Sequence, residues 1–330
     1  MKKTAIAAVL SIACLTAAPV TAFAQEVAVG GQIVGIQIST QGVMVAGVGP
    51  VETAKGSCSP AEEAGVKEGD FVTAINGQAI TSSGELLAVV AALDGDSAQL
   101  SLLRDKRERT VTVQPVLSTQ GQWMLGMWLR DGVSGIGTVT FYDPGSGVYG
   151  ALGHSVSDES SGLVLPLDTG RITDVEIVDV IPGAAGAPGE LSGCTDVGQV
   201  LGSVEKNTGH GIYGHLNASL GGRMVETAQL QPGPAVLLST VSGRETKEYQ
   251  VVVSRLYRDG SGRHAIITVT DPELCARTGG IVQGMSGSPI LQNGKLVGAV
   301  THVFINDPTR GYAIAIQDML DDAEIEDMAA

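Results

Sequence analysis

"GIVQGMSGSPILQNGKLVGAV", residues 280–300, is a run of glycines and serines set between two short apolar segments. The second segment turns back at Asn293-Gly294, a dipeptide typical of a two-residue hairpin turn. Glycine and serine are common in ordinary hairpin loops. They also let a backbone turn sharply enough to present one hydroxyl for chemistry. The stretch therefore predicts paired strands and leaves two roles open for its serines.

The composition around this stretch favours a mainly β protein. The chain has 330 residues, enough for two domains, with 45 glycines and only 4% aromatic residues. Segments rich in Val, Ile and Thr, such as "GIGTVTFYD", "YQVVVSRLY" and "HAIITVTD", are separated by Gly, Asp or Pro. A hydrophobic content of 43% excludes a chain that is mainly disordered.

The N-terminus predicts export. Two lysines precede an apolar run that ends at Ala22-Phe23-Ala24, the pattern of a secretory signal over residues 1–24 with an A-x-A cleavage site. An uncleaved membrane anchor is the alternative, which Pro19 and the short apolar run disfavour. The net charge is −15, and removal of the two lysines leaves −17. Such acidity argues against binding to nucleic acid or to an anionic membrane.

The cysteines predict neither a metal site nor a disulfide framework. Cys14 lies in the signal, and Cys58, Cys194 and Cys275 remain without a C-x-x-C pair. We expect buried or incidental thiols, with at most one disulfide, and no cofactor.

The sequence pattern of residues 34–115 is typical of an α+β domain. "SPAEEAGVKEGDFVTAINGQAI" predicts a helix near Pro60 and a strand ending at Ile75, and "SSGELLAVVAAL" predicts a helix behind a serine cap. The segment resembles a bacterial PDZ domain. PDZ domains bind a peptide as an added strand, often with its C-terminal carboxylate on backbone N–H groups. The resemblance implies a binding loop at Val34, Gly35, Ile36, Gln37 and Ile38. A packing module with an empty groove is the alternative.

Residues 116–330 form the second predicted domain. Short strands and glycine turns dominate it, and its length suits a chymotrypsin-like double β-barrel. Two barrels that meet at a cleft bring together residues far apart in sequence.

The motif "GMSGSP", residues 284–289, has the form G-x-S-G-x-P and looks like the nucleophile loop of chymotrypsin-type serine proteases. Ser286 is at the nucleophile position, and Ser288 replaces a glycine and is expected to be structural. Glycines beside the serine let amides near Gly284 and Ser286 point at the oxyanion of a tetrahedral intermediate.

A serine nucleophile needs a base to take its proton. His154 lies in a compact glycine-framed turn, "YGALGHSVSD", upstream of Ser286 and in the other predicted barrel. This order matches the chymotrypsin group. We interpret His302 as support within the cleft. The remaining histidines, expected in polar or structural positions, are His210, His215 and His264.

Together these motifs point to one family. A PDZ domain followed by "GALGHSVSD", "GAPGELSG", "GHGIYGH", "GIVQGMSGSPI" and "THVFINDPTRGYAI" resembles the stage IV sporulation protein B serine peptidases, the SpoIVB family. The resemblance implies a protease exported to the space between forespore and mother cell. It implies cleavage of its own chain and of a membrane-tethered regulator, which triggers intramembrane proteolysis and activates a late sigma factor. The short cleavable signal and the Ala- and Gly-rich composition depart from the family pattern.

The third catalytic residue is the hardest to place. The resemblance implies Asp271, in "IITVTDPELC", 15 residues before Ser286. Chymotrypsin-type enzymes place this carboxylate farther upstream, so Asp158 and Asp179 remain alternatives. A turn cap before Pro272 is the other role open to Asp271.

Two rival functions remain. One is a catalytically inactive scaffold that binds peptides through its PDZ and protease-like domains. The other is a metal-dependent hydrolase using His210 and His215, whose i, i+5 spacing suits neither a helical nor a strand ligand pair.

Overall fold

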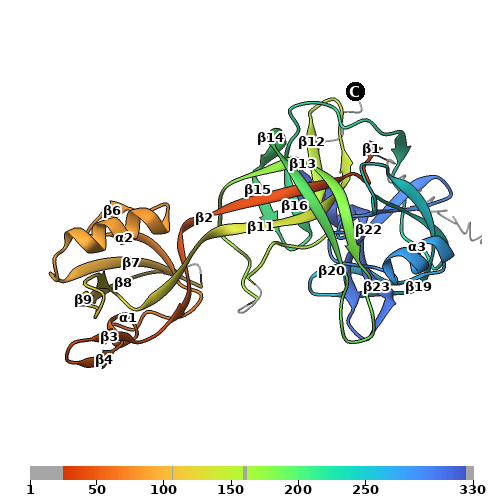
Figure 1. The fold of residues 1–330 in the computed structure, drawn as a ribbon. Coiled ribbons are helices and arrows are strands. Elements are labelled where there is room, and N and C mark those ends of the chain that lie inside the picture. Colours follow the sequence, from red (N-terminus) through yellow and green to blue (C-terminus); the bar gives the residue numbers. More distant parts are fainter. Residues whose placement is uncertain (1–24, 106, 159–161, 325–330) are drawn as a thin grey trace, which may run out of the picture.

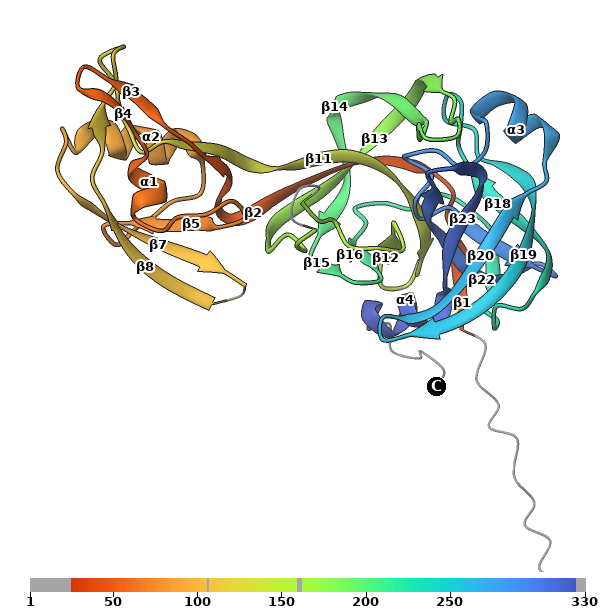
Figure 2. The same ribbon diagram turned by 90° about the horizontal axis from the view of Figure 1, so that it is seen from below.

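The computed structural model describes residues 25–105, 107–158 and 162–324 (Figure 1). The predicted signal, residues 1–24, lies outside the described residues. Two lobes of unequal size are joined by a long two-stranded ribbon (Figures 1 and 2). No helix in the described ranges is long and apolar enough to span a bilayer.

The ribbon consists of β2 (Ile33–Val48) and β11 (Met127–Tyr142). The two strands run antiparallel, from the pair Val48 and Met127 at one end to the pair Ile33 and Thr138 at the other. The regular register is interrupted between Arg130 and Gly132, where residues 40–43 of β2 have no partner in the β11 ladder. The chain leaves the ribbon at one end, builds the small lobe and returns along β11.

The small lobe has the PDZ arrangement of a curved sheet closed by a helix. α2 begins behind Ser82, whose hydroxyl accepts a hydrogen bond from the Glu85 amide, and it buries Leu86 and Val90. Its elements are β3 (Val51–Thr53), β4 (Gly56–Cys58), α1 (Pro60–Glu63), β5 (Phe71–Ile75), β6 (Gln78–Ala79), α2 (Ser83–Ala92), β7 (Ala98–Arg104), β8 (Arg107–Val113), β9 (Val116–Leu117) and β10 (Trp123–Met124).

The domain order differs from the linear one expected from the sequence. β1 (Glu26–Val29) pairs with β11 and with β17 (Met224–Glu226), both in the large lobe. Residues 33–40 of β2 pair there too, on β11 and on β13 (Leu167–Ile181). The PDZ lobe is therefore an insertion into the first half of the peptidase lobe. The local sequence pattern did not reveal this, because strand pairing is set by partners a hundred residues away.

The first half of the large lobe is an open half-barrel. Its curved sheet runs in the order β15-β16-β12-β11-β2, and β13 and β14 extend it from the other edge of β2. The strands not yet given are β12 (Val148–Ala151), β14 (Glu190–Val204), β15 (Lys206–Thr208) and β16 (Gly211–His215).

The second half is a closed barrel in the order β18-β19-β20-β23-β22-β21. Its strands are β18 (Gly233–Ser239), β19 (Lys247–Asp259), β20 (Gly262–Val269), β21 (Pro289–Gln292), β22 (Lys295–Phe304) and β23 (Asp307–Ala315). α3 (Pro272–Thr278) precedes the loop to β21. The structure confirms the expected mainly β fold of a PDZ module and a two-barrel protease, with the first barrel open.

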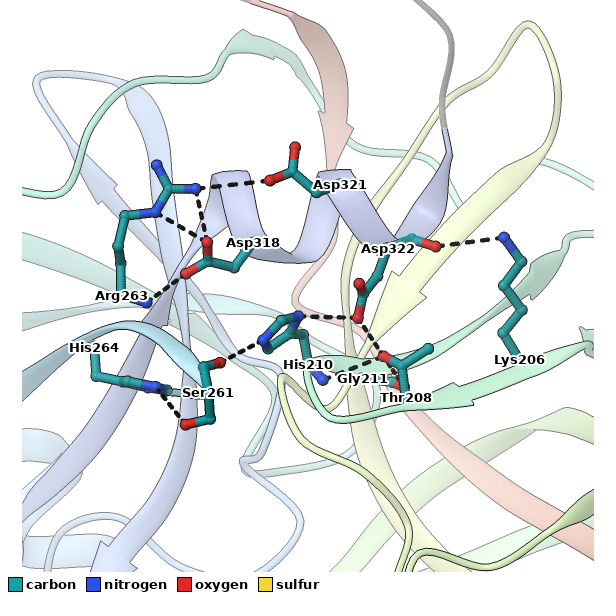
Figure 3. A network of polar contacts seen from close by, with 10 residues as sticks. All are labelled: Lys206, Thr208, His210, Gly211, Ser261, Arg263, His264, Asp318, Asp321 and Asp322. Carbon is teal, nitrogen blue, oxygen red and sulfur yellow. Dashed lines mark hydrogen bonds and ion pairs between the residues drawn. The ribbon is translucent and has the colours of Figure 1, made fainter. Parts of the chain in front are cut away.

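α4 (Ile316–Ala323) connects the two halves of the large lobe through side-chain contacts (Figures 2 and 3). Arg263 of the closed barrel donates its backbone N–H and two guanidinium N–H groups to Asp318. Asp322 accepts hydrogen bonds from Thr208 and from His210 of the half-barrel. Burial raises the pKa of Asp318, but the hydrogen bonds from Arg263 outweigh it and hold this pKa below its usual value.

Candidate active site

A cleft of about 740 Å³ lies where the half-barrel meets the closed barrel. His154, Ser286 and His302 line it. Half of its other lining residues are aliphatic, namely Ile36, Val133, Ile136, Leu152, Val156, Ile281, Val282, Val303 and Ile305. A largely apolar recess with a few polar groups is the usual form of a ligand or substrate site.

The loop that carries Ser286 is fixed by burial and by glycine. Met285 is fully buried in the closed-barrel core. Gly287 has φ +92°, and a Cβ there would collide with the Thr138 carbonyl oxygen and the Leu152 amide, so a larger residue is excluded. Between these anchors the Ser286 hydroxyl donates a hydrogen bond to the Thr301 carbonyl oxygen at 2.7 Å.

Two amides of this loop are unused. Within the described ranges, the N–H groups of Gly284 and Ser286 have no hydrogen-bond acceptor, whereas those of Met285, Gly287 and Ser288 are all bonded to carbonyls. Free N–H groups next to a serine are what an oxyanion hole requires.

His154 follows a strained turn. The Gly153 amide bonds to the Ala151 carbonyl, which forces Leu152 to φ +71°. A non-glycine residue at positive φ costs on the order of 1–3 kcal/mol and is enriched at functional sites. His154 Nδ1 lies 2.8 Å from the Ser155 carbonyl oxygen, which can only accept. A neutral ring therefore has its proton on Nδ1 and a free lone pair on Nε2. Burial lowers the pKa of His154, partly offset by this hydrogen bond.

His302 lies against the same ring. The centroids of the His154 and His302 rings are 4.4 Å apart, with a tilt of 34° between planes. The pairing of β22 with β23 shifts register between Val300 and Val303, and this bulge places Thr301 and His302 at the cleft. Burial and then the neighbouring His154 lower the pKa of His302 to about 4, so both rings are neutral near pH 7.

The predicted site residues come together only in part. Ser286 and His154 line one cleft from opposite halves, but no hydrogen bond joins them. Asp271 is not in this cleft. It caps α3, and its carboxylate accepts hydrogen bonds from the amides of Glu273, Leu274 and Gln250.

The two alternative carboxylates are also engaged elsewhere. Asp158 lines the cleft and is buried, and one carboxylate oxygen lies 3.5 Å from an Arg130 nitrogen. Asp179 is exposed on β13 and accepts a hydrogen bond from the Val180 amide. Across the described residues, no carboxylate forms a hydrogen bond or an ion pair with His154.

Comparison with known protein families shows to which family the chain belongs. The profile of the SpoIVB peptidase S55 family matches residues 121–320. The chain belongs to this family. A PDZ domain profile matches residues 34–114, so the resemblance inferred from the motifs is confirmed.

The curated relatives match over short stretches of the chain. A probable periplasmic DegP-like serine endoprotease of Marinomonas sp. is 43% identical over 56 residues, which is 17% of this chain and 12% of that protein. A putative zinc metalloprotease of Mesorhizobium japonicum is 35% identical over 78 residues, 24% of this chain and 21% of that protein. The chain thus spans a small part of these relatives. The Rv3671c protease of M. tuberculosis has a TM-score of 0.34 at 12% identity, over 59% of this chain and 85% of that structure.

The peptide-binding loop predicted for this SpoIVB family member is corrected by the strand pairing. Residues 34–38 lie in the middle of β2, with one edge bonded to β11 and the other to β13. Val34, Ile36 and Ile38 are buried in the half-barrel core. A strand paired on both edges has no N–H or C=O groups left for a peptide, so these residues do not form the PDZ groove.

Farther along β2, the strand edge at residues 44–48 is covered by the chain itself. Residues 127–130 of β11 pair with residues 44–48 of β2 and so take the position of an added strand. Leu125, Met127 and Leu129 pack on the core that contains Leu86 and Val90 of α2. The segment 123–131 is bonded at both ends of α2, by Trp123 to Asp94 and by Ser83 to Asp131.

The other histidines have separate partners. His210 bonds Asp322, His215 bonds Glu205, and His264 lies next to Asp259. The described residues contain no group of three metal-ligating side chains. Cys58, Cys194 and Cys275 are free thiols.

Sequence reasoning missed the backbone groups of the site. The Thr301 carbonyl accepts a hydrogen bond from the Ser286 hydroxyl, and the Ser155 carbonyl lies within hydrogen-bond distance of His154 Nδ1. Neither depends on side-chain identity, so the sequence has no signal for them. The strain at Leu152 was equally hidden, because leucine is not a residue that predicts positive φ.

Proposed function

We propose that this chain is a serine endopeptidase that acts outside the cytoplasm, with Ser286 as the nucleophile and His154 as the general base. One observation carries the proposal. Ser286 and His154 line the same apolar cleft from opposite halves of the peptidase lobe, and two unbonded amides flank the serine. Membership in a family of peptidases supports the same reading.

The geometry suggests an order of events. When a substrate enters, the Ser286 hydroxyl turns from the Thr301 carbonyl to Nε2 of His154, gives up its proton and attacks the peptide carbonyl. The resulting oxyanion accepts hydrogen bonds from the Gly284 and Ser286 amides. His154 then donates the proton to the leaving amine. The Ser155 carbonyl keeps Nδ1–H in place, which is the orienting role that a carboxylate has in a Ser-His-Asp triad.

Family membership supports a finer assignment of substrate and place. We propose cleavage of its own chain and of a membrane-tethered regulatory protein during sporulation, in the space between forespore and mother-cell membranes. That cut triggers intramembrane proteolysis and activation of a late sigma factor. The DegP-like relatives are named as periplasmic, which agrees with an extracytoplasmic site. The aliphatic lining of the cleft favours substrates with apolar residues around the cut bond.

The PDZ lobe is proposed to take peptides, including C-termini, in the groove between β2 and α2. Residues 125–131 fill this groove, so an incoming peptide must displace them. Peptide binding should therefore be weak in the intact chain. It should strengthen when Leu129 is changed to Asp, because a charge weakens the internal strand. Fluorescence anisotropy of a labelled peptide with an apolar C-terminus measures both affinities.

A catalytically inactive scaffold is the second candidate, and one observation favours it. The Ser286 hydroxyl is bonded to a carbonyl and not to His154, and no carboxylate among the described residues supports the histidine. Looser catalytic hydrogen bonds are common in enzymes without bound substrate, so the endopeptidase remains the better supported function.

A fluorophosphonate probe separates the two functions. We expect covalent labelling of the wild type, no labelling of Ser286→Ala, and normal labelling of Ser288→Ala, because Ser288 is fully buried and bonds Ser239. Mass spectrometry of fragments formed by wild type and by Ser286→Ala then reports self-cleavage. Absence of labelling in the folded wild type would leave the scaffold as the function.

A further inference from the structure

We propose that Thr138 and Thr140 are positioning residues for Ser286, holding the carbonyl groups of the nucleophile loop so that the free Ser286 amide faces the substrate. The inference rests on the proposed function for its catalytic consequence. Both threonines lie on β11 of the half-barrel, while the loop belongs to the closed barrel. They bond the loop across the boundary between the two halves.

Three loop carbonyls are bonded to two residues. The Thr138 hydroxyl donates to the Gly284 carbonyl at 3.0 Å, and the Thr138 amide donates to the Ser286 carbonyl at 2.9 Å. The Thr140 hydroxyl donates to the Gly287 carbonyl at 2.7 Å. Both side chains are almost completely buried, with 1% and 0% of their surface exposed. Water does not compete for hydrogen bonds at such positions.

The position of these bonds along the loop explains their effect. A carbonyl fixes its whole peptide plane, including the N–H of the following residue. The bonds to Gly284 and Ser286 fix the planes on both sides of the one that carries the Ser286 N–H. The central plane is itself bonded through the Met285 carbonyl to the Ser288 amide. The Ser286 N–H therefore has one orientation, set largely from β11.

Two adjacent buried threonines on one face of a strand call for a physical explanation, since threonine is mostly exposed in proteins. A valine has the same shape and packs better in a sheet, and its methyl group avoids the cost of burying a hydroxyl. Thr138 and Thr140 alternate with the buried Val139 along β11 and face the loop together. Each hydroxyl is satisfied by a loop carbonyl, part-buried at Gly284 and buried at Gly287.

The test replaces one hydroxyl with a methyl group. Thr138→Val and Thr140→Val should each lower kcat by about 10- to 100-fold with little change in KM, since a small displacement of catalytic groups costs that much. Thr138→Ser keeps the hydroxyl and should restore most of the rate. Thr173→Val is the matched control, a buried threonine of the half-barrel whose hydroxyl lies 3.5 Å from the Gly35 carbonyl, outside the nucleophile loop.

Hydrogen exchange supplies a readout that needs no activity. In the Ser286→Ala background, Thr138→Val should speed exchange of amides in residues 284–288 about fivefold, which corresponds to one net hydrogen bond of about 1 kcal/mol. Thr173→Val should leave these amides unchanged. Equal kcat for all three valine variants, or unchanged exchange in Thr138→Val, would overturn the proposal. An inactive wild type with faster exchange in Thr138→Val would instead refute only the peptidase function.

Discussion

Replacing Asp271 separates two roles for its carboxylate. In the structure it caps α3, accepting three amide hydrogen bonds, and it does not contact His154. As the third member of a triad it would orient the catalytic histidine. Asn and Ser cap helices about as well as Asp, whereas neither can replace a triad carboxylate. Asp271→Asn and Asp271→Ser therefore keep one role and remove the other.

The expected magnitudes are far apart. Loss of the triad carboxylate lowers kcat by about 10⁴-fold, whereas loss of an N-cap costs about 0.5–2 kcal/mol of stability. In a domain of this size, 1 kcal/mol shifts the melting temperature by about 2–4 °C. We expect Asp271→Asn and Asp271→Ser to keep kcat within about a factor of three, less than 1 kcal/mol of barrier. Asp271→Ala should lower the melting temperature by about 1–8 °C.

The assay combines kcat for a peptide substrate with calorimetry of the same samples. Asp158→Asn is the comparison, since that carboxylate lines the cleft. If Asp271→Asn melts at the wild-type temperature but loses a thousandfold or more of kcat, about 4 kcal/mol of barrier, the capping explanation is refuted. Asp271 would then have to reach His154 in the substrate complex.

Three further outcomes are expected. Arg104→Leu should destabilise the PDZ lobe by about 3–5 kcal/mol, because it leaves the buried Asp70 carboxylate without its cation; denaturation followed by tryptophan fluorescence measures this. Because burial lowers the pKa of His154, its neutral form persists below the ordinary value of about 6.5, so the acid limb of kcat/KM should lie below that pH; a limb at higher pH would contradict it. The hydrogen bonds from Arg263 lower the pKa of Asp318 in the folded state, so this contact stabilises the fold fully above the unfolded pKa of about 3.9. This stability is lost as the pH falls through the pKa of the folded state. Asp318→Asn should therefore flatten the pH dependence of the melting temperature in thermal melts.

The sequence predicts short-range features of this chain well. The G-x-S-G-x-P loop, the glycine-framed His154 turn and the PDZ helices follow from local pattern, and the structure contains each of them. These features depend on glycine conformations and capping residues, which are encoded within a few positions.

Long-range pairing was the source of the errors. Apolar residues recur along the whole length of β2, and nothing in that pattern shows that its first half belongs to another lobe. The peptide-binding loop was therefore placed too early, at residues 34–38. Asp271 shows the related difficulty for function, because a carboxylate before Pro272 suits a cap and a catalytic site equally well.

Because the chain enters and leaves the PDZ lobe through the same two-stranded ribbon, the lobe can be excised as one unit. Ser39 and Gly132 face each other as a cross-strand pair, so the chain enters and leaves the lobe at points only about 5 Å apart. A two-residue turn can join them and close β2 and β11 into a plain hairpin. Excision at this pair, in place of the linear boundary at residue 115, keeps residues 33–39 of β2 and residues 132–142 of β11, and with them the pairing of these two segments in the half-barrel. By the same geometry, another folded module whose termini lie close together can be grafted there, with the peptidase lobe as its carrier.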